Sequence, residues 1–508
     1  MAPATLTVGD STRQLLAELD RFFAGRGVQA YVVGGFVRDA LLGRGCHDID
    51  LSFAGDPLEV GRELADAFGG HYFPLAEEQH VARVLLTERK VHIDLMPLSA
   101  EIEADLAERD FTIDAMAVPL AEAGSGRGTV IDPAGGLADL RGRVVRVVRE
   151  DAFRQDALRP LRGARLAVEL GFAVEAQTAT LIAAYAPQLP TVSAERRRDE
   201  LMRIMATPRA GEGLRLLDDL GLLERLVPEM DVARGVEQPK EHYWDVFGHS
   251  LEAVGNLDIL LGEEEPRDRH WRTLWRELWG QLAWWREARP YFREELLAER
   301  PRSAVLKLAA LLHDIAKPET KTFDDTGRMR FFGHADAGAR QCGRILRRLR
   351  FSAREVALVQ TMVKAHLRPV QMGQQGPPTR RALYRYFRDC GDAAIPTLFL
   401  SLADHLGTVG PRVSGPGWRQ HVALVNYILT KRFQEEETIS PPKLLGGDEL
   451  MAELELSPGP MIGRLIETLR EAQAAGEIST REEALALART CLAGQPSPPL
   501  AGAGGEGG

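Results

Sequence analysis

The first 150 residues show short apolar runs and alternating segments that predict strands joined by helices. Residues 31–33 (YVV) form an apolar run, the next segment (GGFVRDALLG) predicts a tight turn followed by a helix, and HDIDLSF alternates as a strand does. Val81–Met96 predicts a hairpin of two alternating strands around a charged turn. We therefore expect an α/β head domain at residues 1–150.

Beyond the head the pattern becomes helical. Leucine, alanine and arginine recur at spacings of three and four residues from Asp156 to about Pro228, and a Trp-rich stretch that we interpret as packing lies inside a second helical unit. The tail from Gly494 is rich in proline and glycine, so we expect it to be disordered. The predicted regions are the head at 1–150, an all-helical neck at 151–238, a second helical domain at 239–440, a C-terminal helical module at 441–491 and the tail at 492–508.

Composition adds little to this picture. A chain of 508 residues is too long for one hydrophobic core, and its 44% hydrophobic and 27% charged residues are ordinary for a globular protein. No stretch has the apolar length of a membrane span, the start lacks a signal pattern, and the four cysteines are scattered, so we expect a cytoplasmic protein with no membrane contact. A net charge of −10 does not indicate a nucleic-acid binder, but phosphate contacts depend on local patches and not on total charge. Arginine clusters do occur, and we interpret each of them, taken alone, as a solvated helix face; one contains Arg380, Arg381, Arg385 and Arg388.

Two aspartates two residues apart on a predicted strand carry the sharpest chemical signal. Residues at this spacing point to the same side of a strand, so Asp48 and Asp50 present their carboxylates together. Divalent cations neutralise the repulsion between such carboxylates, and Mg²⁺ prefers oxygen ligands. Asp94, in the second strand of the hairpin, is a candidate third carboxylate. A DxD on a strand is common, but a glycine pair, an Arg-Asp and a helix-length spacer before it are much less so.

Other residues of the same segments fit phosphate and base recognition. Gly34 and Gly35 allow a backbone turn to approach a phosphate, and Arg38 offers a fork of donors to it. Further along the chain, a carboxylate and three guanidinium groups recur every three residues, which predicts one helix face that presents acceptors and donors side by side. These four residues are Asp156, Arg159, Arg162 and Arg165.

These motifs resemble the class II tRNA nucleotidyltransferase and bacterial poly(A) polymerase family. GGFVRDALLGRGCHDIDL resembles its first motif, ERDFTIDAMAV its nucleotide-contacting segment with Arg109 at the arginine position, and FRQDALRPLRGARLAVELGF its EDxxR motif. The segments VSAERRRDEL and GGDELMAELELSPGPMIGRLIETL resemble the neck helix and the end of the family's chains. The resemblance implies a polymerase-beta-like head with a mixed sheet, followed by helical neck, HD and tail domains.

The family's activity is the addition of nucleotides from CTP and ATP to the 3′ end of tRNA, without a template. The resemblance implies that Mg²⁺ is held by Asp48 and Asp50, with Asp94 as a candidate third catalytic carboxylate, and that Asp156 with Arg159 pairs with the incoming base. Triphosphate contacts are then expected from the remaining residues, Gly34, Gly35, Arg38, Arg109, Arg162 and Arg165. The expected partners are tRNA, CTP and ATP, and no DNA is expected.

Five positions depart from the family pattern. Glu108 replaces an arginine, Asp114 an asparagine, Gln155 a glutamate and Ala157 a proline, and Pro160 lies in the early part of the predicted helix. Proline is tolerated in a helix only near the first turn. Because Asp156 and Arg159 remain, base selection is expected to be kept. The departures leave open whether C, C and A are all added or only some of them.

A second constellation contains the segment LLHDIAKP, in which His313 and Asp314 are adjacent. With His249 upstream and Asp404 downstream it resembles the HD phosphohydrolase superfamily, and the resemblance implies that these four residues bind a divalent transition metal ion. His334 and His366 are candidates for a second metal ion. A mixture of imidazole and carboxylate ligands suits a metal ion that activates water for attack on a phosphoester.

Several alternatives stay open. A poly(A) polymerase would share the head motifs but accept only ATP, and a CC-adding or A-adding enzyme would perform part of the reaction. A protein of another class would be an HD phosphohydrolase whose head only recruits RNA. A non-catalytic RNA-binding protein would not need Asp48 and Asp50.

Overall fold

The structure is a computed structural model that describes residues 2–45, 48–76, 80–98, 101–262, 264–282, 285–297, 300–413, 415–434 and 442–493. The chain divides into two compact units, residues 1–228 and 229–508. The predicted disordered tail at 492–508 lies outside the described residues from 494 onwards, and the finer domain boundaries at 150, 238 and 440 remain predictions. In the described part of the chain, no helix combines the length and the apolar character that a membrane span requires.

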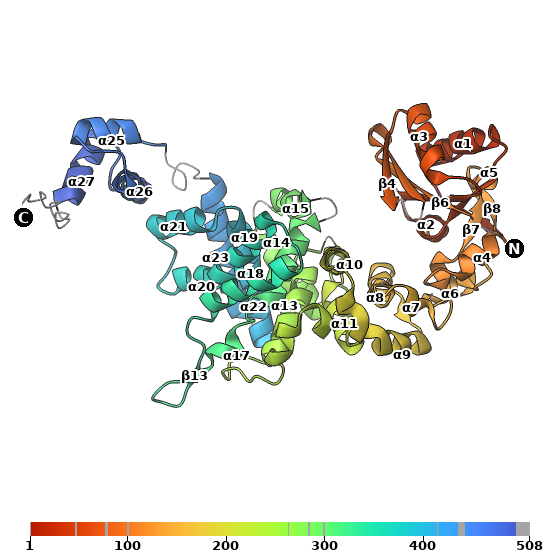
Figure 1. The fold of residues 1–508 in the computed structure, drawn as a ribbon. Coiled ribbons are helices and arrows are strands. Elements are labelled where there is room, and N and C mark those ends of the chain that lie inside the picture. The colour runs from red at the N-terminus through yellow and green to blue at the C-terminus, as the bar shows by residue number, and fades with distance from the viewer. Residues whose placement is uncertain are drawn as a thin grey trace, which may run out of the picture. The chain divides into compact units, whose positions relative to one another are not determined.

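The head contains a six-stranded sheet, and this sheet is mixed, as the family resemblance implies (Figure 1). The strand order is β4-β5-β6-β3-β2-β7, in which β3 pairs with β6 in parallel and the other neighbours pair antiparallel. The strands are β2 (Ala30–Val33), β3 (Asp48–Phe53), β4 (His71–Ala76), β5 (Val81–Leu86), β6 (Val91–Pro97) and β7 (Ala117–Pro119). The predicted strand–turn–helix–strand segment and the predicted hairpin are therefore confirmed.

Short helices and one further two-stranded sheet surround the large sheet. They are α1 (Asp10–Ala24), α2 (Gly35–Leu41), α3 (Pro57–Phe68), α4 (Ile102–Ala107), α5 (Leu120–Ala123), α6 (Gly136–Gly142), and the pair β1 (Ala2–Thr5) and β8 (Arg127–Val130). Alternate residues of β3 and β6 form the buried core of the sheet, for example Ile49, Leu51, Ile93 and Leu95, none more than 1% exposed. Because the apolar residues of each strand face one side, the intervening aspartates are placed on the other.

The remainder of the first unit is a helical neck. Its elements are α7 (Ala152–Gln155), α8 (Arg159–Leu170), α9 (Ala176–Tyr185), α10 (Ala194–Ala206), α11 (Ala210–Asp219), α12 (Leu223–Leu226) and the two-residue strands β9 (Val144–Val145) and β10 (Ala173–Val174). Pro160 lies in the first turn of α8, where its missing N–H costs nothing. Helix α8 packs against α10 and α11, and its Leu161 and Leu166 are buried.

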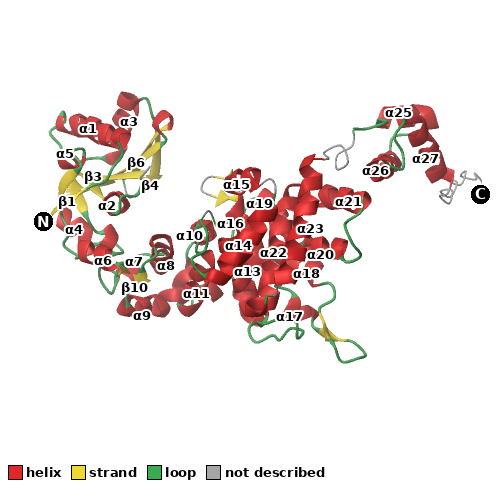
Figure 2. Cartoon of the chain, turned by 180° about the vertical axis from the view of Figure 1, so that it is seen from behind, coloured by secondary structure: helices red, strands yellow, loops and turns green. Residues whose placement is uncertain are grey.

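The second unit is mostly helical (Figure 2). Its main helices are α13 (Val246–Leu260), α14 (Arg269–Gln281), α15 (Trp285–Arg293), α16 (Arg302–Leu312), α17 (Lys317–Thr320), α18 (His334–Arg348), α19 (Ala353–Ala365), α20 (Arg368–Gly373), α21 (Arg380–Cys390), α22 (Ala394–Val409) and α23 (Gly415–Gln434). The C-terminal module contains α25 (Gly447–Leu454), α26 (Pro460–Ala475) and α27 (Arg481–Ala493).

The expectation of an all-helical remainder was wrong in detail. Two small antiparallel hairpins interrupt the helices, β11 (Glu295–Leu297) with β12 (Arg300–Pro301), and β13 (Thr322–Phe323) with β14 (Met329–Arg330). Strands of two or three residues are too short to show an alternating pattern. The Trp-rich stretch packs as predicted, because the ring of Trp279 lies against that of Phe399 and α14 lies against α23.

Candidate functional site

The head sheet brings the three predicted carboxylates together. In the parallel pairing of β3 with β6, Asp50 lies directly opposite Asp94, and Asp48 lies two residues from Asp50 on the same face. Asp48 is exposed, whereas Asp50 and Asp94 are partly buried. This geometry provides an oxygen-rich face with one accessible and two more enclosed carboxylates, which suits a hard divalent cation.

Two basic side chains of neighbouring strands border this face. Arg83 of β5 makes a bidentate contact with Asp94, with Nε 2.7 Å from Oδ1 and Nη2 2.8 Å from Oδ2. The imidazole Nδ1 of His92 lies 3.2 Å from Asp48 Oδ1. Neither residue was identified from the sequence, although the register of the predicted hairpin places Arg83 opposite Asp94. The contact with Arg83 offsets the charge of Asp94, so Asp48 and Asp50 are the freer pair.

The carboxyl group of Asp50 has a raised pKa. Burial and the neighbouring carboxylate of Asp94 raise the pKa of Asp50 to about 6, against the opposing effect of the Arg109 guanidinium. A carboxyl group whose folded-state pKa is raised binds a proton more readily in the folded than in the unfolded chain. The protonated carboxyl group of Asp50 therefore contributes to the stability of the folded state below the unfolded-state pKa. This contribution is lost as the pH rises through the folded-state pKa.

We expect Asp50→Asn to stabilise the metal-free protein above pH 6, because the substitution removes a buried charge that its neighbours repel. A pKa rise of about two units corresponds to at most about 3 kcal/mol. The measurement is the thermal midpoint of both proteins in chelator at about pH 7.5 and about pH 4, above and below the folded-state pKa. The variant should have the higher thermal midpoint at about pH 7.5 but not at about pH 4. An equal difference between the two proteins at both pH values would contradict the prediction.

The glycine turn between β2 and α2 lies against the carboxylates. Gly34 has φ +67°, and a Cβ atom there would come 2.7 Å from Arg109 Nη1 and 3.5 Å from Asp50 Oδ2. A side chain at this position would therefore displace the Arg109 guanidinium, whose Nε is buried without a hydrogen-bond partner. Gly35 begins α2 and packs beside Arg38. The missing side chain at Gly34 therefore allows the Arg109 guanidinium to lie against the turn next to Asp50.

Arg38 is engaged within the protein. Its guanidinium donates to both carboxylate oxygens of Asp39, at 3.0 and 2.9 Å, and to Asp114 Oδ1 at 2.5 Å. Arg38 is 9% exposed, so these contacts form a nearly closed ion-pair cluster under the turn. The structure thus places Arg38 next to the predicted phosphate site with its donors directed to two aspartates.

The helix predicted to carry Asp156 begins three residues later. Asp156 lies between α7 and α8 and Arg159 is the first residue of α8, so the two do not share a helix face. The expectation of one continuous helical stripe was wrong at this position, because the chain turns before Pro160. The Asp156 carboxylate accepts hydrogen bonds from Arg196 of α10, at 3.3 and 2.6 Å.

The other two arginines of α8 are held by carboxylates of other segments. Arg162 Nη1 donates to Asp110 Oδ2 at 2.9 Å, and Arg165 donates to Glu200 and Glu169, each at 2.5 Å. Arg165 is 8% exposed. Arg162 is partly buried, and burial opposes a pKa rise that Asp110 and Glu200 bring about. Arg165 therefore joins α8 to α10, whereas Arg162 joins α8 to the loop that carries Arg109.

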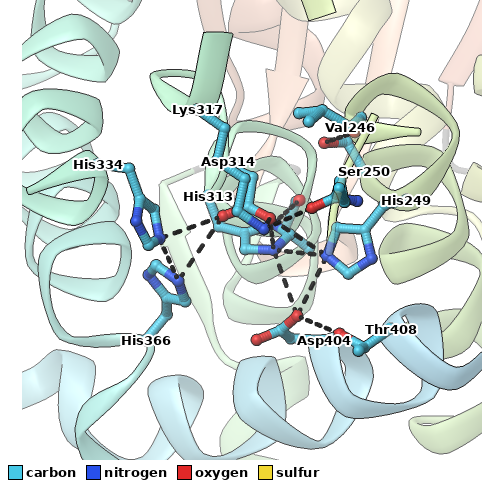
Figure 3. Close-up of polar contacts among 12 residues, drawn as sticks. Val246, His249, Ser250, His313, Asp314, Lys317, His334, His366, Asp404 and Thr408 are labelled. Carbon is cyan, nitrogen blue, oxygen red and sulfur yellow. Dashed lines mark hydrogen bonds and ion pairs between the residues drawn. The ribbon is translucent and has the colours of Figure 1, made fainter. Parts of the chain in front are cut away.

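The second unit brings the predicted histidine set together in its core (Figure 3). His249 Nε2 of α13 lies 3.1 Å from His313 Nε2 and 3.4 Å from Asp314 Oδ2. Asp404 Oδ1 of α22 lies 3.1 Å from His249 Nε2 and 3.7 Å from His313 Nε2. Four ligands from three helical segments thus converge on one point.

The other oxygen of Asp314 faces a second pair of imidazoles. His334 Nε2 of α18 lies 3.4 Å and His366 Nε2 at the end of α19 lies 3.9 Å from Asp314 Oδ1, and the two Nε2 atoms are 3.4 Å apart. Figure 3 shows Asp314 between the two pairs. A carboxylate that faces ligands on both of its oxygens is an arrangement suited to a two-metal centre.

Backbone hydrogen bonds fix the orientation of three of these rings. The Nδ1–H groups of His313, His334 and His366 donate to the carbonyls three residues earlier, at 2.8, 2.7 and 2.7 Å. The Nε2 atom of each ring therefore points into the cluster, where it carries a lone pair in a neutral ring and a proton in a charged one. Opposed lone pairs only about 3 Å apart need a cation or a proton between them. A hydrogen bond from the other ring nitrogen to a carbonyl is typical of histidines that bind metal ions.

The charges of the cluster also indicate a site for cations. Burial lowers the pKa of His313, but the carboxylates of Asp314 and Asp404 outweigh it and raise this pKa to about 10. Burial and the positive charge of His313 lower the pKa of His366 to about 4. His313 therefore keeps its positive charge at neutral pH in the absence of metal, and the donor set fits divalent cations in its place.

A cavity of about 730 Å³ opens onto this centre and is bordered by Asp314, His334, His366 and Asp404. Its walls combine cationic, aromatic and amide side chains, namely Lys317, Arg328, Arg330, Phe331, Phe332, Gln374 and Gln420. Lys317 and His242 also line the cavity, and neither residue was identified from the sequence. Lys317 Nζ lies 2.5 Å from Asp314 Oδ2, and the position of this lysine one helical turn after Asp314 would have indicated it.

Models of three known families match the chain. The poly A polymerase head domain matches residues 30–97 and 86–146, a probable RNA and SrmB-binding site of polymerase A matches 171–234, and the HD domain matches 281–408. The HD match contains five of the six residues in the histidine cluster and excludes His249. The stretch from Asp156 to Arg165 lies between two of the matched ranges.

Proteins with similar sequences carry related names. The chain is 36% identical to an A-adding tRNA nucleotidyltransferase of Deinococcus radiodurans, over 90% of this chain and 94% of the relative. It is 35% identical to a CC-adding tRNA nucleotidyltransferase of Thermus thermophilus, over 90% and 92% of the two chains. The fold is similar to that of a Thermotoga maritima CCA-adding enzyme complexed with tRNA, with a TM-score of 0.57, 20% identity and coverage of 97% of this chain and 100% of that chain.

Proposed function

Because the chain belongs to the family of tRNA nucleotidyltransferases and bacterial poly(A) polymerases, we propose that it adds C and A nucleotides from CTP and ATP to the 3′ end of tRNA. The observation that carries the proposal is the carboxylate face of β3 and β6 beside the Gly34 turn. It is joined to a helical neck whose counterpart in a solved CCA-adding enzyme belongs to a complex with tRNA.

The chemistry divides among the residues of the head. Asp48 and Asp50 would hold Mg²⁺, which activates the 3′ hydroxyl and neutralises the leaving pyrophosphate when it is bound. Arg109 extends its guanidinium toward the Gly34 turn and offers donors to the triphosphate. Arg83 holds Asp94 in place by its bidentate contact, which keeps a third carboxylate directed along the same face.

Base selection falls to Asp156 and Arg159. A carboxylate accepts and a guanidinium donates hydrogen bonds, so together they complement the edge of a nucleotide base. Asp156 bonds to Arg196 in the structure, and its use in base recognition requires that this partly exposed pair opens. Solvent-accessible ion pairs of this kind contribute at most about 1 kcal/mol, so a nucleotide readily displaces one.

A partial reaction is the second candidate. The relatives that cover 90% of the chain at 35% and 36% identity are named for CC addition and for A addition, not for the complete sequence. The substitutions at Glu108 and Gln155 lie next to the base-selecting pair, where a change of nucleotide preference would arise.

The experiment is incorporation of labelled CTP and ATP, separately and together, into tRNAs that end before the first C, the second C or the A. Stepwise addition to CCA supports the full reaction, and addition that begins or stops between C and A supports the partial one. Long A tails with CTP ignored would assign a poly(A) polymerase. We expect no addition to a tRNA that already ends in CCA.

The histidine cluster supports a second activity in the same chain. We propose that His249, His313, Asp314 and Asp404 bind one divalent transition metal ion, and that His334 and His366 with Asp314 bind another. The metal ions would supply an activated water for hydrolysis of a phosphoester. Lys317 and the arginines of the cavity wall offer positive charge to a phosphate that enters there.

A further inference from the structure

Two of the positions that depart from the family pattern lie in contact with each other. Gln155 stands where the family has glutamate and Glu108 where it has arginine. The side-chain amide of Gln155 donates from Nε2 to Glu108 Oε2 at 2.9 Å, although the two residues are 47 positions apart. Both side chains are exposed, so solvent and ligands reach this contact. The two departures are therefore one structural feature rather than two separate changes.

The Gln155 amide also contacts the base-selecting arginine. Its Oε1 accepts a hydrogen bond from Arg159 Nη1 at 3.1 Å. A glutamine can donate to a carboxylate and accept from a guanidinium at once, whereas a glutamate can only accept. With a carboxylate at position 108, glutamine is the side chain of this length that bridges Glu108 to Arg159.

The positive charge beside Glu108 comes from Arg149. Arg149 donates from Nη1 and Nη2 to the two carboxylate oxygens of Glu108, both at 2.5 Å. Gln155 and Arg149 lower the pKa of Glu108, which keeps it ionised. At position 108 this chain has a glutamate paired with Arg149 where the family has an arginine. At position 155 the neutral Gln155 stands where the family has a negatively charged glutamate.

These contacts determine where the Arg159 guanidinium points. Besides Gln155, it donates to the backbone carbonyls of Ala152 and Glu108, at 3.1 and 3.2 Å. The three acceptors hold one arrangement of the Arg159 donor fork. Since a base is recognised by the direction of its donors and acceptors, the direction of the fork affects which base fits.

We propose that Arg149, Glu108 and Gln155 are positioning residues that orient Arg159 and set the preference of this enzyme between CTP and ATP. The inference rests on the proposed nucleotidyltransferase function. The three residues act through Arg159 and not by contact with the triphosphate. Their substitution changes the ratio of kcat/KM for the two nucleotides, with most of the effect in the KM of the preferred one.

The test uses the full-length enzyme and a tRNA acceptor at a step that the wild type performs. The variants are Gln155→Ala, Gln155→Glu, Glu108→Arg and the double variant Glu108→Arg/Gln155→Glu, which restores the residues of the family pattern. Gln155→Glu places two carboxylates side by side, and Glu108→Arg places a second guanidinium beside Arg149. We expect each single variant to change the CTP/ATP ratio by about tenfold or more, the effect of one lost hydrogen bond.

The double variant separates positioning from a structural effect. An arginine introduced at position 108 and a glutamate introduced at position 155 can pair and form the bridge to Arg159 again. The CTP/ATP ratio of the double variant should therefore depart from the value that the two single effects predict together. Glu103→Gln, which neutralises an exposed glutamate of α4, is the charge control and should leave the ratio unchanged. Thermal midpoints of all proteins show which variants fold.

Two results would overturn the inference. The first is single variants that lower kcat/KM for CTP and ATP equally, which would make the cluster merely structural. The second is additive behaviour in the double variant, which would mean that positions 108 and 155 act independently. A wild-type enzyme that adds neither nucleotide would refute the proposed function itself, and the inference would fall with it.

Discussion

Nucleotide addition by the Asp48→Ala/Asp50→Ala enzyme should fall by roughly 10⁴-fold or more, because the substitutions remove both of the freer carboxylates on the head sheet. Asp94 cannot take their place, since Arg83 binds both of its oxygens. The loss should appear with CTP and with ATP alike, because the metal site serves the triphosphate and not the base. Incorporation into a tRNA acceptor at saturating nucleotide measures it.

This loss should occur without unfolding. Asp50 carries an ionised carboxylate that burial and Asp94 disfavour at neutral pH, so its removal should leave the thermal midpoint equal or higher. Asp66→Ala is the matched control, because Asp66 is an exposed aspartate of α3 in the same domain. A double variant with more than about a tenth of wild-type activity would show that Asp48 and Asp50 do not form the catalytic centre.

The local pattern of the sequence was sufficient for the head. Alternation along β3 and the hairpin of β5 with β6 predicts which aspartates face one side, and the glycine pair predicts the turn beside them. Strand period and turn chemistry are local properties, so they can be derived from neighbouring residues. The histidine set was predicted from its resemblance to the HD phosphohydrolase superfamily, and the structure brings these residues together.

Partners that lie far apart in the sequence could not be predicted. Asp156 meets Arg196, 40 positions away, and Arg165 meets Glu200, 35 positions away, because α8 packs on α10. The arginine cluster of α21 is another example. Arg381, Arg385 and Arg388 bind glutamates of the C-terminal module, so this cluster, which sequence alone interprets as a solvated face, joins α21 to α26. Periodicity shows the face of a helix but not the neighbour against which it packs.

The second unit offers an equally strong test at Asp314, whose two oxygens face the two imidazole pairs. We expect Asp314→Asn to reduce the bound divalent metal from two ions per chain to less than one, and to reduce hydrolysis of bis-p-nitrophenyl phosphate by about 10³-fold. Nucleotide addition should be retained, because the carboxylates of the head belong to the other unit. Elemental analysis after dialysis and the two activity assays measure these effects.

The substitution also affects stability, and a second variant separates that effect from metal loss. Lys317 and His313 lose their buried counter-charge when Asp314 becomes neutral, which costs about 3–5 kcal/mol if no metal ion replaces it. His334→Ala keeps Asp314 and removes a ligand of one pair only, so it should retain one metal ion with a smaller change in the thermal midpoint. Asp325→Asn, on an exposed loop, is the control. Retention of both metal ions by Asp314→Asn would show that the carboxylate does not bridge the two sites, and the cluster would then need another explanation for its opposed imidazoles.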